Sequence, residues 1–347
     1  MRRINVNTSK KYDIIIEEGL ISDANKYIKE VYNKKKIYII TDERVAPFYL
    51  DNFINGLKDY DCQFVIIEGY EKAKSIESFT SVVSSLIEKG IRRGDLLVAL
   101  GGGVIGDLTG FISGTLYRGI DYIQVPTTIL AQNDSSIGGK TAINIKEGKN
   151  LIGVFNQPKM VLIDPLTIKT LPKREIDSGL GEVIKHGLIR NEEIIKMLEN
   201  DYPYEDILYE SILVKKEVVL ADEFDTGERM ILNFGHTFGH VIEKMGGFSK
   251  YLHGEAVILG MLMALRLGEY YNKTDKNIYP RLVNLLDKLS IKYEDYSIYD
   301  YLPKIMYDKK NISGIIHFVL VSNIGKTNII EINEKDLEKM AGDFLEY

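Results

Sequence analysis

The sequence predicts an α/β first half built around a parallel sheet and a second half that is mainly helical. Three observations support this prediction. Short apolar runs alternate with helical stretches up to residue 171, long helical patterns dominate beyond it, and one apolar run ends in three glycines at residues 101–103. Strands that alternate with helices form parallel sheets, because each helix carries the chain back to the end at which the next strand begins.

The predicted strands of the first half are short and rich in Ile, Val and Leu. The first two flank the turn residues 7–10 and are expected to form a hairpin. We expect strands at residues 4–6, 13–16, 37–41, 64–67, 96–100, 122–125 and 161–163, with helices at 21–32, 45–57 and 76–88 and another after the glycines.

Helical periodicity dominates after Pro172. We expect helices at residues 175–189, 207–221, 234–245, 255–271 and 280–289, and one late hairpin from strands 315–321 and 327–332. This change divides the chain into two domains, 1–171 and 172–347. A chain of 347 residues fits two domains of about 100–200 residues each.

Composition limits the classes of partner. The formal net charge is -6 and no basic stretch offsets it, so nucleic acid is not expected as a partner. A small anionic substrate stays compatible, since a local cationic pocket can form in an acidic protein. The single cysteine, Cys62, excludes an intrachain disulfide and is expected to act as a small buried hydrophobe.

The apolar segments bear on localisation. No apolar stretch with a small-residue cleavage site follows the first arginines, so no secretory signal is predicted. The longest apolar run, residues 256–265, is too short to span a bilayer and is expected to be a buried helix. We therefore expect a cytoplasmic protein without a membrane partner.

Two features of the first half are suited to a cofactor. The glycines at 101–103 and Gly106 would let backbone N–H groups at a helix N-terminus approach a pyrophosphate. Their spacing is not G-x-G-x-x-G, and taken alone they fit a tight strand-to-helix turn better. Thr127 and Thr128 end a strand, where hydroxyls either bind a cofactor or, more commonly, cap the next helix.

A polar loop follows at residues 131–141. Its end, Gly-Gly-Lys-Thr, resembles a P-loop, but Asp134 stands where the first glycine belongs, so a nucleoside-triphosphate site is disfavoured. Lys140, Lys149 and Asn150 suit a phosphate group, and they suit a solvated loop equally well.

The second half contains a possible metal site. Glu182 and Lys185 are three residues apart, and His236 and His240 are four apart, so each pair shares one face of a helix. With His253, one carboxylate and two imidazoles leave an open position on zinc, the catalytic arrangement. There is no H-E-x-x-H motif, which makes a zincin protease unlikely. His317, in an apolar run, is expected to be a core residue.

Arg229 precedes Asn233 by one helical turn and His236 by two, so one helical face could carry all three. A guanidinium is suited to bidentate binding of a carboxylate. The alternative is a surface salt bridge with Glu228 or Asp225.

Together these motifs resemble those of the 3-dehydroquinate synthase family of sugar phosphate cyclases. The resemblance runs from about Glu71 to Lys326 and rests on segments in the family's order: 101–107, 117–119, 124–128, 134–141, 148–153, 169–172, 181–187, 229–240 and 252–256. It implies a Rossmann-like NAD-binding first domain and a helical second domain that supplies most metal ligands.

The resemblance also implies roles for individual residues. The NAD contacts would be Glu71, Lys74, Gly103, Val104, Ile105, Gly106, Asp107, Thr127, Thr128, Lys140, Lys149, Thr167, Ile168, Lys169 and Thr170. The metal ligands would be Glu182, His236 and His253, with zinc the default ion and cobalt an alternative. The substrate-pocket positions would be Asp134, Lys140, Asn150, Lys185, Lys215, Arg229 and Asn233, with His240 near the substrate phosphate. One of Lys309 and Lys310 would reach the phosphate, and Arg118 would enter the site of a neighbouring subunit, which implies a homodimer.

The implied activity is conversion of 3-deoxy-D-arabino-heptulosonate 7-phosphate to 3-dehydroquinate and phosphate, a lyase reaction of the shikimate pathway that makes aromatic amino acids. The alternatives are another cyclase, such as a 2-deoxy-scyllo-inosose or 2-epi-5-epi-valiolone synthase, a metal-dependent polyol dehydrogenase, or an inactive binding protein. Arg229 and Lys215 favour a sugar acid as substrate. Three positions depart from the family pattern. Tyr70 stands where the family usually has glycine, Asn133 replaces an apolar residue beside Asp134, and His186 replaces the usual aromatic residue after Lys185.

Overall fold

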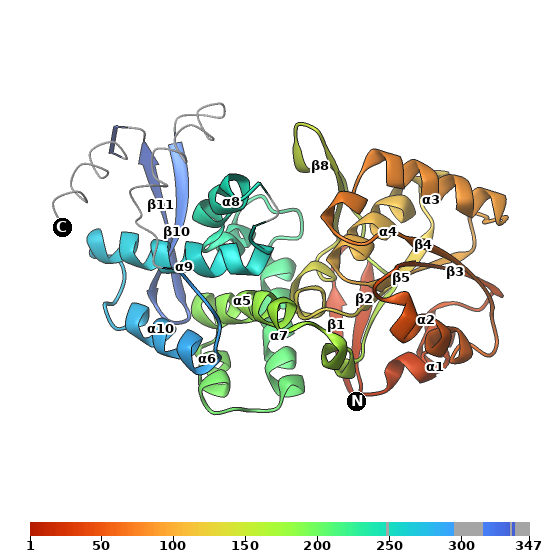
Figure 1. The fold of residues 1–347 in the computed structure, drawn as a ribbon, viewed down its shortest axis with the longest axis horizontal. Coiled ribbons are helices and arrows are strands. Elements are labelled where there is room, and N and C mark those ends of the chain that lie inside the picture. Colours follow the sequence, from red (N-terminus) through yellow and green to blue (C-terminus); the bar gives the residue numbers. More distant parts are fainter. Residues whose placement is uncertain (248–249, 295–314, 334, 337–347) are drawn as a thin grey trace. The chain divides into compact units, whose positions relative to one another are not determined.

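The computed structural model describes residues 1–247, 250–294, 315–333 and 335–336 (Figure 1). The chain forms two compact units. The first unit comprises Met1–Pro172 and Lys215–Phe224, and the second comprises Lys173–Val214 and the chain from Asp225 onward. The chain therefore returns to the first unit after leaving it, which a division at a single point does not describe.

The first unit is built on a seven-stranded sheet, and it confirms the predicted α/β class. The strand order is β1-β2-β9-β6-β5-β3-β4, with β1 and β2 antiparallel and the other pairs parallel. The strands are β1 (Arg2–Asn7), β2 (Lys11–Ile16), β3 (Lys36–Asp42), β4 (Asp61–Ile67), β5 (Leu96–Gly101), β6 (Asp121–Pro126) and β9 (Met160–Ile163). All seven correspond to strands expected from the sequence.

Helices cover both faces of this sheet, as Figure 1 shows. Successive residues of a strand point to opposite faces. Ile37 and Ile39 of β3 therefore pack with residues of α1 (Asn25–Val31) and α2 (Ala46–Asn55), while Tyr38 and Ile40 pack with α3 (Ile76–Glu88) and α4 (Gly103–Thr115). Because both faces are buried, the strands are almost continuously apolar, and this is why they were predictable.

The order of the parallel strands indicates at which edge of the sheet a ligand is expected to bind. From β3 the chain moves outward to β4 and then returns to the other side of β3 as β5, followed by β6. In open α/β sheets, ligands bind outside the carboxyl ends of the strands at such a reversal. The carboxyl end of β5 leads into the glycines at 101–103, and that of β6 leads into Thr127 and Thr128.

A hairpin projects from the first unit where the polar loop expected at residues 131–141 ends, in a segment for which no strand was expected. β7 (Lys140–Ile145) pairs antiparallel with β8 (Gly148–Phe155), and a turn at Lys146 and Glu147 joins them (Figure 1). The turn lacks the Asn-Gly or Asp-Gly pair that signals a hairpin in a sequence. The neighbouring lysines and asparagines made the segment look like a loop.

The second unit is mainly helical, as predicted. Its helices are α5 (Lys173–Ile189), α6 (Glu192–Glu199), α7 (Tyr204–Ala221), α8 (His236–Met245), α9 (His253–Tyr270) and α10 (Ile278–Lys288), with a hairpin of β10 (Ile315–Asn323) and β11 (Lys326–Asn333). The end of α7, from Lys215, counts with the first unit. Helix α6 was not predicted, although Asn191 caps it by accepting a hydrogen bond from the backbone N–H of Glu193.

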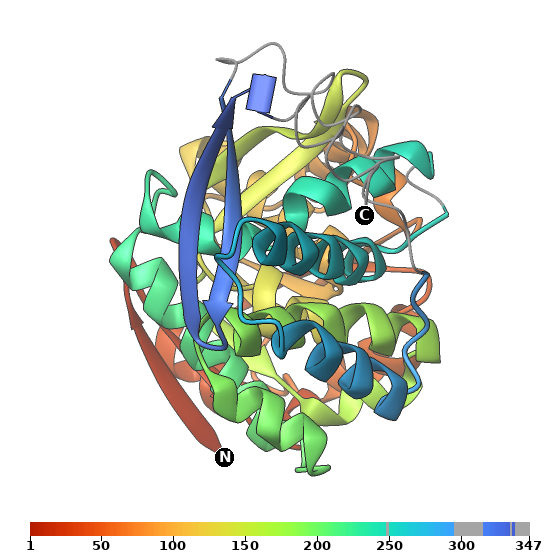
Figure 2. The ribbon, with the colours of Figure 1, turned by 90° about the vertical axis from the view of Figure 1, so that its left-hand side faces the viewer.

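Helix α9 is the centre of the second unit and packs against α5, α8, α10 and β10 (Figure 2). Two glycines allow its neighbours to approach closely. A Cβ atom on Gly254 would lie 1.7 Å from the carbonyl oxygen of Ser178 in α5, and one on Gly260 would lie 1.9 Å from that of Gly235. These contacts hold the first turn of α9 against α5, and the residue before α8 against α9.

Two expectations about single residues had different outcomes. Cys62 is half-buried and packs against the apolar core of the first unit, in keeping with its expected role. His317 is 44% exposed beside Glu331, so its prediction as a core residue was wrong. It points away from the buried face of a strand that covers the core on one side only.

Within the described residues, none of the helices has the length and apolar character needed to cross a bilayer.

Candidate metal and cofactor sites

The glycines at the end of β5 and in the first turn of α4 lie so close to neighbouring side chains that a larger residue would not fit there. Helix α4 begins at the third of them, Gly103, with Gly102 as its N-cap. A Cβ atom on Gly103 would lie 2.9 Å from Oγ of Ser135, and one on Gly106 would lie 2.5 Å from Oε1 of Gln124 in β6. The first turn of α4 also offers backbone N–H groups without helical acceptors, which bind phosphate in many proteins. The NAD contacts predicted for residues 103–107 stay a prediction.

The two threonines after β6 differ in their partners. Thr128 Oγ1 accepts a hydrogen bond from the backbone N–H of Ala131 at 3.2 Å, so it caps the following turn. Thr127 is 2% exposed, and no described residue forms a hydrogen bond with its hydroxyl. A buried hydroxyl without a partner is costly, and a ligand that bonds to it would remove that cost.

The predicted contacts at residues 167–170 lie in a short 3-10 helix, Pro165–Thr170. Thr167 accepts a hydrogen bond from Nε2 of Gln132 at 2.8 Å, and the hydroxyl of Thr170 lies 2.5 Å from that of Tyr49. Both hydroxyls therefore have protein partners. Lys169, between them, is exposed.

Four of the predicted residues of the first unit meet around Lys74. Its ammonium group donates to Oδ2 of Asp107 at 2.5 Å and to Oδ1 of Asn150 at 2.6 Å, and lies 4.0 Å from Oε1 of Glu71. Lys74 is 4% exposed. Burial lowers its pKa, but the charges of Asp107 and Glu71 outweigh this and raise the pKa, so the ammonium stays charged.

Asn144 completes this network, and no role was expected for it from the sequence. Its side chain donates to Oε1 of Glu71 at 2.8 Å and accepts from the backbone N–H of Asn150 at 2.8 Å. Its backbone N–H donates to the carbonyl of Lys74 at 2.7 Å. The β7–β8 hairpin thus connects the Glu71–Lys74 segment to Asn150. Recognising the hairpin would have placed Asn144 near Asn150.

The remaining predicted residues of the first unit lie at several places. Lys215 donates to Oδ1 of Asp134 at 2.5 Å, and both side chains are largely buried. Lys140 is exposed at the start of β7, and Lys149 is half-buried in β8. Arg118 is exposed in a turn after α4 and has a φ angle of 62°.

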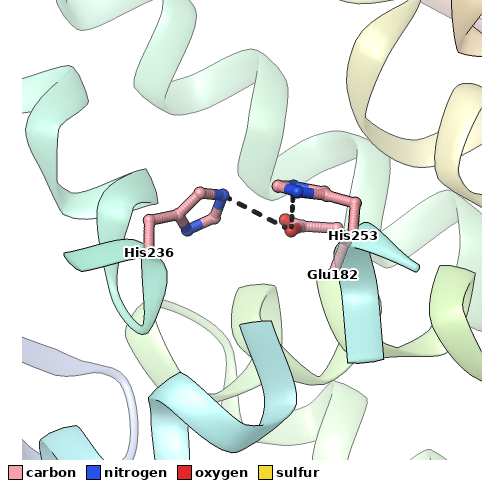
Figure 3. Close-up of side chains that lie close together, drawn as sticks. All are labelled: Glu182, His236 and His253. Carbon is pink, nitrogen blue, oxygen red and sulfur yellow. Dashed lines mark ion pairs between the residues drawn. The ribbon is translucent and has the colours of Figure 1, made fainter. Parts of the chain in front are cut away.

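The three predicted metal ligands of the second unit converge, as Figure 3 shows. Glu182 comes from the middle of α5, and His236 and His253 are the first residues of α8 and α9. Nε2 of His236 lies 3.6 Å from Oε1 of Glu182, and Nε2 of His253 lies 3.5 Å from the same oxygen. Both imidazoles therefore point the same nitrogen at one carboxylate oxygen.

These distances fit a bound metal ion. Nitrogen and oxygen ligands about 2.1 Å from a tetrahedral zinc lie about 3.4 Å from one another. Glu182 is fully buried, and no described residue forms a hydrogen bond with either of its carboxylate oxygens, although Lys185 forms an ion pair with Oε2. A buried carboxylate that faces two imidazoles is a donor set that binds a divalent cation.

The electrostatics of these groups agree with this arrangement. Burial would raise the pKa of Glu182, but Lys185 and the two imidazoles hold that pKa well below its usual range, so the carboxylate is charged. Burial and the charge of Lys185 lower the pKa of His236 to about 3, which keeps its imidazole neutral. Burial lowers the pKa of His253, but Glu182 and Glu243 outweigh this and raise it to about 10. A metal ion would displace the proton of His253.

Other predicted residues lie close to the three ligands in the chain or in space. The ring centroids of His236 and His240 are 5.4 Å apart, and those of His240 and His253 are 6.4 Å apart. Lys185 and Arg229 are 2% and 3% exposed, so Arg229 lies in the interior and not on the surface. The glutamate beside it, Glu228, forms an ion pair with Arg190.

One expectation about this segment was wrong. Arg229 and Asn233 lie in a 3-10 helix, Glu228–Asn233, and α8 begins only at His236. Gly235 separates the two with a φ angle of 81°, a left-handed conformation that ends any continuous helix. Arg229, Asn233 and His236 therefore do not share one helical face. Lys309 and Lys310 lie outside the described residues.

Comparison of the fold indicates the class of protein. The chain is similar to a 2-deoxy-scyllo-inosose synthase solved with carbaglucose-6-phosphate, NAD+ and Co2+ (TM-score 0.86, 23% identity, 99% of this chain and 100% of that chain). It is similar to the same degree to a 2-epi-5-epi-valiolone synthase from Streptomyces hygroscopicus subsp. jinggangensis 5008 with NAD+ and Zn2+ (TM-score 0.86, 24% identity, 99% of each chain). The fold is that of the sugar phosphate cyclases.

Sequence comparison identifies the family. Residues 64–178 match the N-terminal and residues 179–311 the C-terminal model of 3-dehydroquinate synthase. A 3-dehydroquinate synthase of Clostridium acetobutylicum is 42% identical over 342 residues, which cover 94% of this chain and 95% of that protein. The chain belongs to the 3-dehydroquinate synthase family.

Proposed function

We propose that the chain converts 3-deoxy-D-arabino-heptulosonate 7-phosphate to 3-dehydroquinate and phosphate. Relatives of that name match nearly the whole chain, and the other cyclases match at much lower identity. The structural observation that supports the proposal most directly is the buried Glu182 carboxylate facing Nε2 of His236 and of His253.

The reaction needs two groups that the chain does not supply by itself. NAD, when bound, would supply reversible hydride transfer at a substrate hydroxyl, so it would act as a catalytic cofactor. Glu182, His236 and His253 would hold a divalent metal, which would supply a Lewis acid for the substrate hydroxyls. Zinc suits one carboxylate and two imidazoles, and cobalt suits them as well.

In the first unit, we assign the residues around Lys74 to cofactor binding. Lys74 donates a hydrogen bond to Asp107 and forms an ion pair with Glu71, so NAD would meet a preformed set of partners. Thr127 offers a buried hydroxyl that no described residue bonds. Lys140, Lys149 and Asn150 supply cationic and amide groups suited to phosphate.

In the second unit, we assign Arg229 to the substrate carboxylate. Its side chain is 3% exposed, and a buried guanidinium binds a carboxylate through two parallel hydrogen bonds. The sister cyclases act on sugars that lack this carboxylate, so Arg229 favours the sugar acid. Lys185, Asn233 and His240 would orient the remaining polar groups of the substrate.

The assembly and location of the protein are also proposals. We infer a homodimer in which the exposed Arg118 serves the neighbouring subunit, and a cytoplasmic enzyme of the shikimate pathway. Size-exclusion chromatography with light scattering tests the proposed homodimer, and the molar mass of a single chain would contradict it.

The test is phosphate release from the proposed substrate by metal-replete enzyme with catalytic NAD, with the organic product identified by NMR. Equal amounts of phosphate and 3-dehydroquinate are expected, and a chelator should abolish both. Turnover of a heptulose or glucose phosphate instead would assign the chain to a sister cyclase.

Arg229→Ala should reduce kcat/KM for the sugar acid by about 10- to 100-fold, since a hydrogen bond between charged groups contributes about 1.5–3 kcal/mol. Its metal content should not change.

A further inference from the structure

Glu243 is a buried carboxylate that the proposed reaction does not use. It lies in α8, and its side chain is 7% exposed. Its Oε2 lies 3.4 Å from Nδ1 of His253, which can donate a hydrogen bond to it. A carboxylate that is nearly removed from water needs such a partner, because burying an uncompensated charge is very unfavourable.

The two nitrogens of His253 therefore face two different carboxylates. Nε2 faces Oε1 of Glu182 at 3.5 Å, inside the group of metal ligands, and Nδ1 faces Glu243 outside it. A histidine that binds a metal through one nitrogen usually donates the other N–H to a carboxylate or carbonyl oxygen, which fixes the tautomer and the ring orientation.

The same pattern recurs at the other imidazole, with a weaker acceptor. Nδ1 of His236 lies 3.3 Å from the backbone carbonyl oxygen of Phe234, while its Nε2 faces Glu182. Both histidines thus present Nε2 to Glu182 and Nδ1 to an oxygen of the protein. Only His253 has a charged acceptor, so its imidazole is the more electron-rich of the two.

We propose that Glu243 is a positioning residue of the metal site: it accepts the Nδ1–H of His253 and so holds Nε2 toward the metal. The proposal rests on the metal site assigned above. Seven residues, or about two turns, separate His236 from Glu243, so α8 supplies one ligand and orients another from the same face. Helix α9, which carries His253, packs against α8, and a Cβ atom on Gly239 would lie 3.1 Å from the carbonyl oxygen of Ala256.

The test compares the metal affinity of Glu243→Leu and Glu243→Gln with that of the wild-type enzyme by competition with a chromophoric chelator. Loss of an outer partner of a metal-bound histidine typically costs 10- to 100-fold in metal affinity, and we expect a loss of about this size for Glu243→Leu. Glu243→Gln keeps an acceptor oxygen and should lose less. In the cobalt-substituted enzyme, the visible spectrum of both variants should change, because the ring of His253 is no longer held in one orientation.

The matched control is Lys244→Gln, which removes a charge from the exposed side of the same helix. Its metal affinity should equal that of the wild type. Circular dichroism and NAD affinity report whether each variant is folded, and if Glu243→Leu does not fold, the Gln variant and its cobalt spectrum decide. A folded Glu243 variant with wild-type metal affinity and an unchanged cobalt spectrum would overturn the proposal. Wild-type enzyme that binds metal but releases no phosphate would overturn the proposed function and leave the role of Glu243 standing.

Discussion

Tyr70 occupies a backbone conformation that is usual only for glycine, with φ 74° and ψ 170°. Such a conformation costs about 1–3 kcal/mol in a residue with a side chain. The guanidinium of Arg44 lies 4.1 Å from the centre of the Tyr70 ring, and a stacked cation of this kind contributes about 0.5–1 kcal/mol at an exposed site. The stacking offsets part of the strain that glycine, the residue expected here from the family pattern, would avoid, and the loop keeps Glu71 next to Lys74.

The other two departures from the family pattern also have local consequences. His186 is fully buried in α5, and its Nδ1 lies 2.8 Å from Oγ of Ser211 in α7, so a hydrogen bond replaces the packing of an aromatic ring. Asn133 is buried, and no described residue forms a hydrogen bond with either polar atom of its side chain. An apolar residue would avoid that cost.

The network around Lys74 makes a prediction at the residue scale. Lys74→Met leaves the largely buried carboxylate of Asp107 without its cation, which should lower the free energy of unfolding by up to about 3 kcal/mol and weaken NAD binding. Burial raises the pKa of Asp107, so its carboxyl group can take up a proton and limit the loss. Urea unfolding and calorimetric titration with NAD measure the two effects. Lys72→Met is the control, because Lys72 is 71% exposed and pairs only with Glu68 among the described ion pairs.

A double variant separates electrostatics from packing. Lys74→Met combined with Asp107→Asn should recover part of the lost stability, since the unpaired charge is gone. If the two substitutions proved additive, the ion pair would not be the cause.

At the scale of single elements, the contact between α4 and β6 depends on Gly106. Gly106→Ala should lower the free energy of unfolding by about 1–3 kcal/mol, because the added methyl group would lie 2.5 Å from Oε1 of Gln124. The substitution should also weaken NAD binding if the first turn of α4 takes part in it. Gly106→Ala combined with Gln124→Ala removes the clash and should restore most of the stability. A single variant as stable as the wild type would show that α4 can shift without cost.

Arg281 connects α10 to both ends of α6 and makes a prediction about pH. It donates to Glu199 at 2.7 Å and to Glu192 at 2.7 Å, and the hydrogen bond from Arg281 lowers the pKa of Glu192 below its usual 4.5. A lowered carboxyl pKa stabilises the fold above the unfolded pKa, and this stabilisation is lost as the pH falls through the folded pKa. Arg281→Met should therefore cost about 1 kcal/mol or less at pH 7, because the groups are partly exposed, and nearly nothing at about pH 3.

Urea unfolding of wild type and variant at both pH values measures this difference. Lys196→Met, which removes a cation 3.7 Å from Glu192, should have a smaller effect at pH 7. An undiminished cost at low pH would mean that Arg281 acts through the packing of its stem.

Sequence patterns predicted most elements and failed where turn chemistry or a backbone break decided the structure. The seven strands of the sheet were found because burial on both faces makes them apolar along their whole length. The hairpin β7–β8 was missed because its turn lacks the usual residues, and the break before α8 was missed because Gly235 was not expected to have a positive φ angle.

At the scale of the whole molecule, spacing alone does not bring the metal ligands together. Glu182 lies 54 residues before His236 (236 − 182), on a helix that packs against α9. The local patterns suggested a carboxylate and two imidazoles, and the family resemblance selected which ones. Neither the local patterns nor the resemblance indicated Glu243, although it follows His236 by seven residues and so lies on the same face of the helix.

The return of the chain at Lys215–Phe224 predicts that a fragment ending at residue 172 is incomplete. Glu223 accepts hydrogen bonds from the backbone and side chain of Ser9, at 2.8 and 2.6 Å, and from Gln157 at 2.9 Å. The fragment 1–172 should unfold at lower urea concentration and bind NAD more weakly than the same fragment joined by a Gly-Ser linker to residues 215–224. Equal midpoints for the two fragments would contradict this.

Because residues 215–224 belong to the first unit, this unit is completed late during synthesis of the chain. A ribosome that has finished Pro172 must still add 52 residues (224 − 172) before the last segment of the first unit exists. At about 5–20 residues per second, this takes about 3–10 s. During that interval the nascent sheet is without Lys215 and Glu223, and the newly made helices α5 and α6 emerge before it is complete. The first unit therefore stays without its last segment for several seconds in every round of translation.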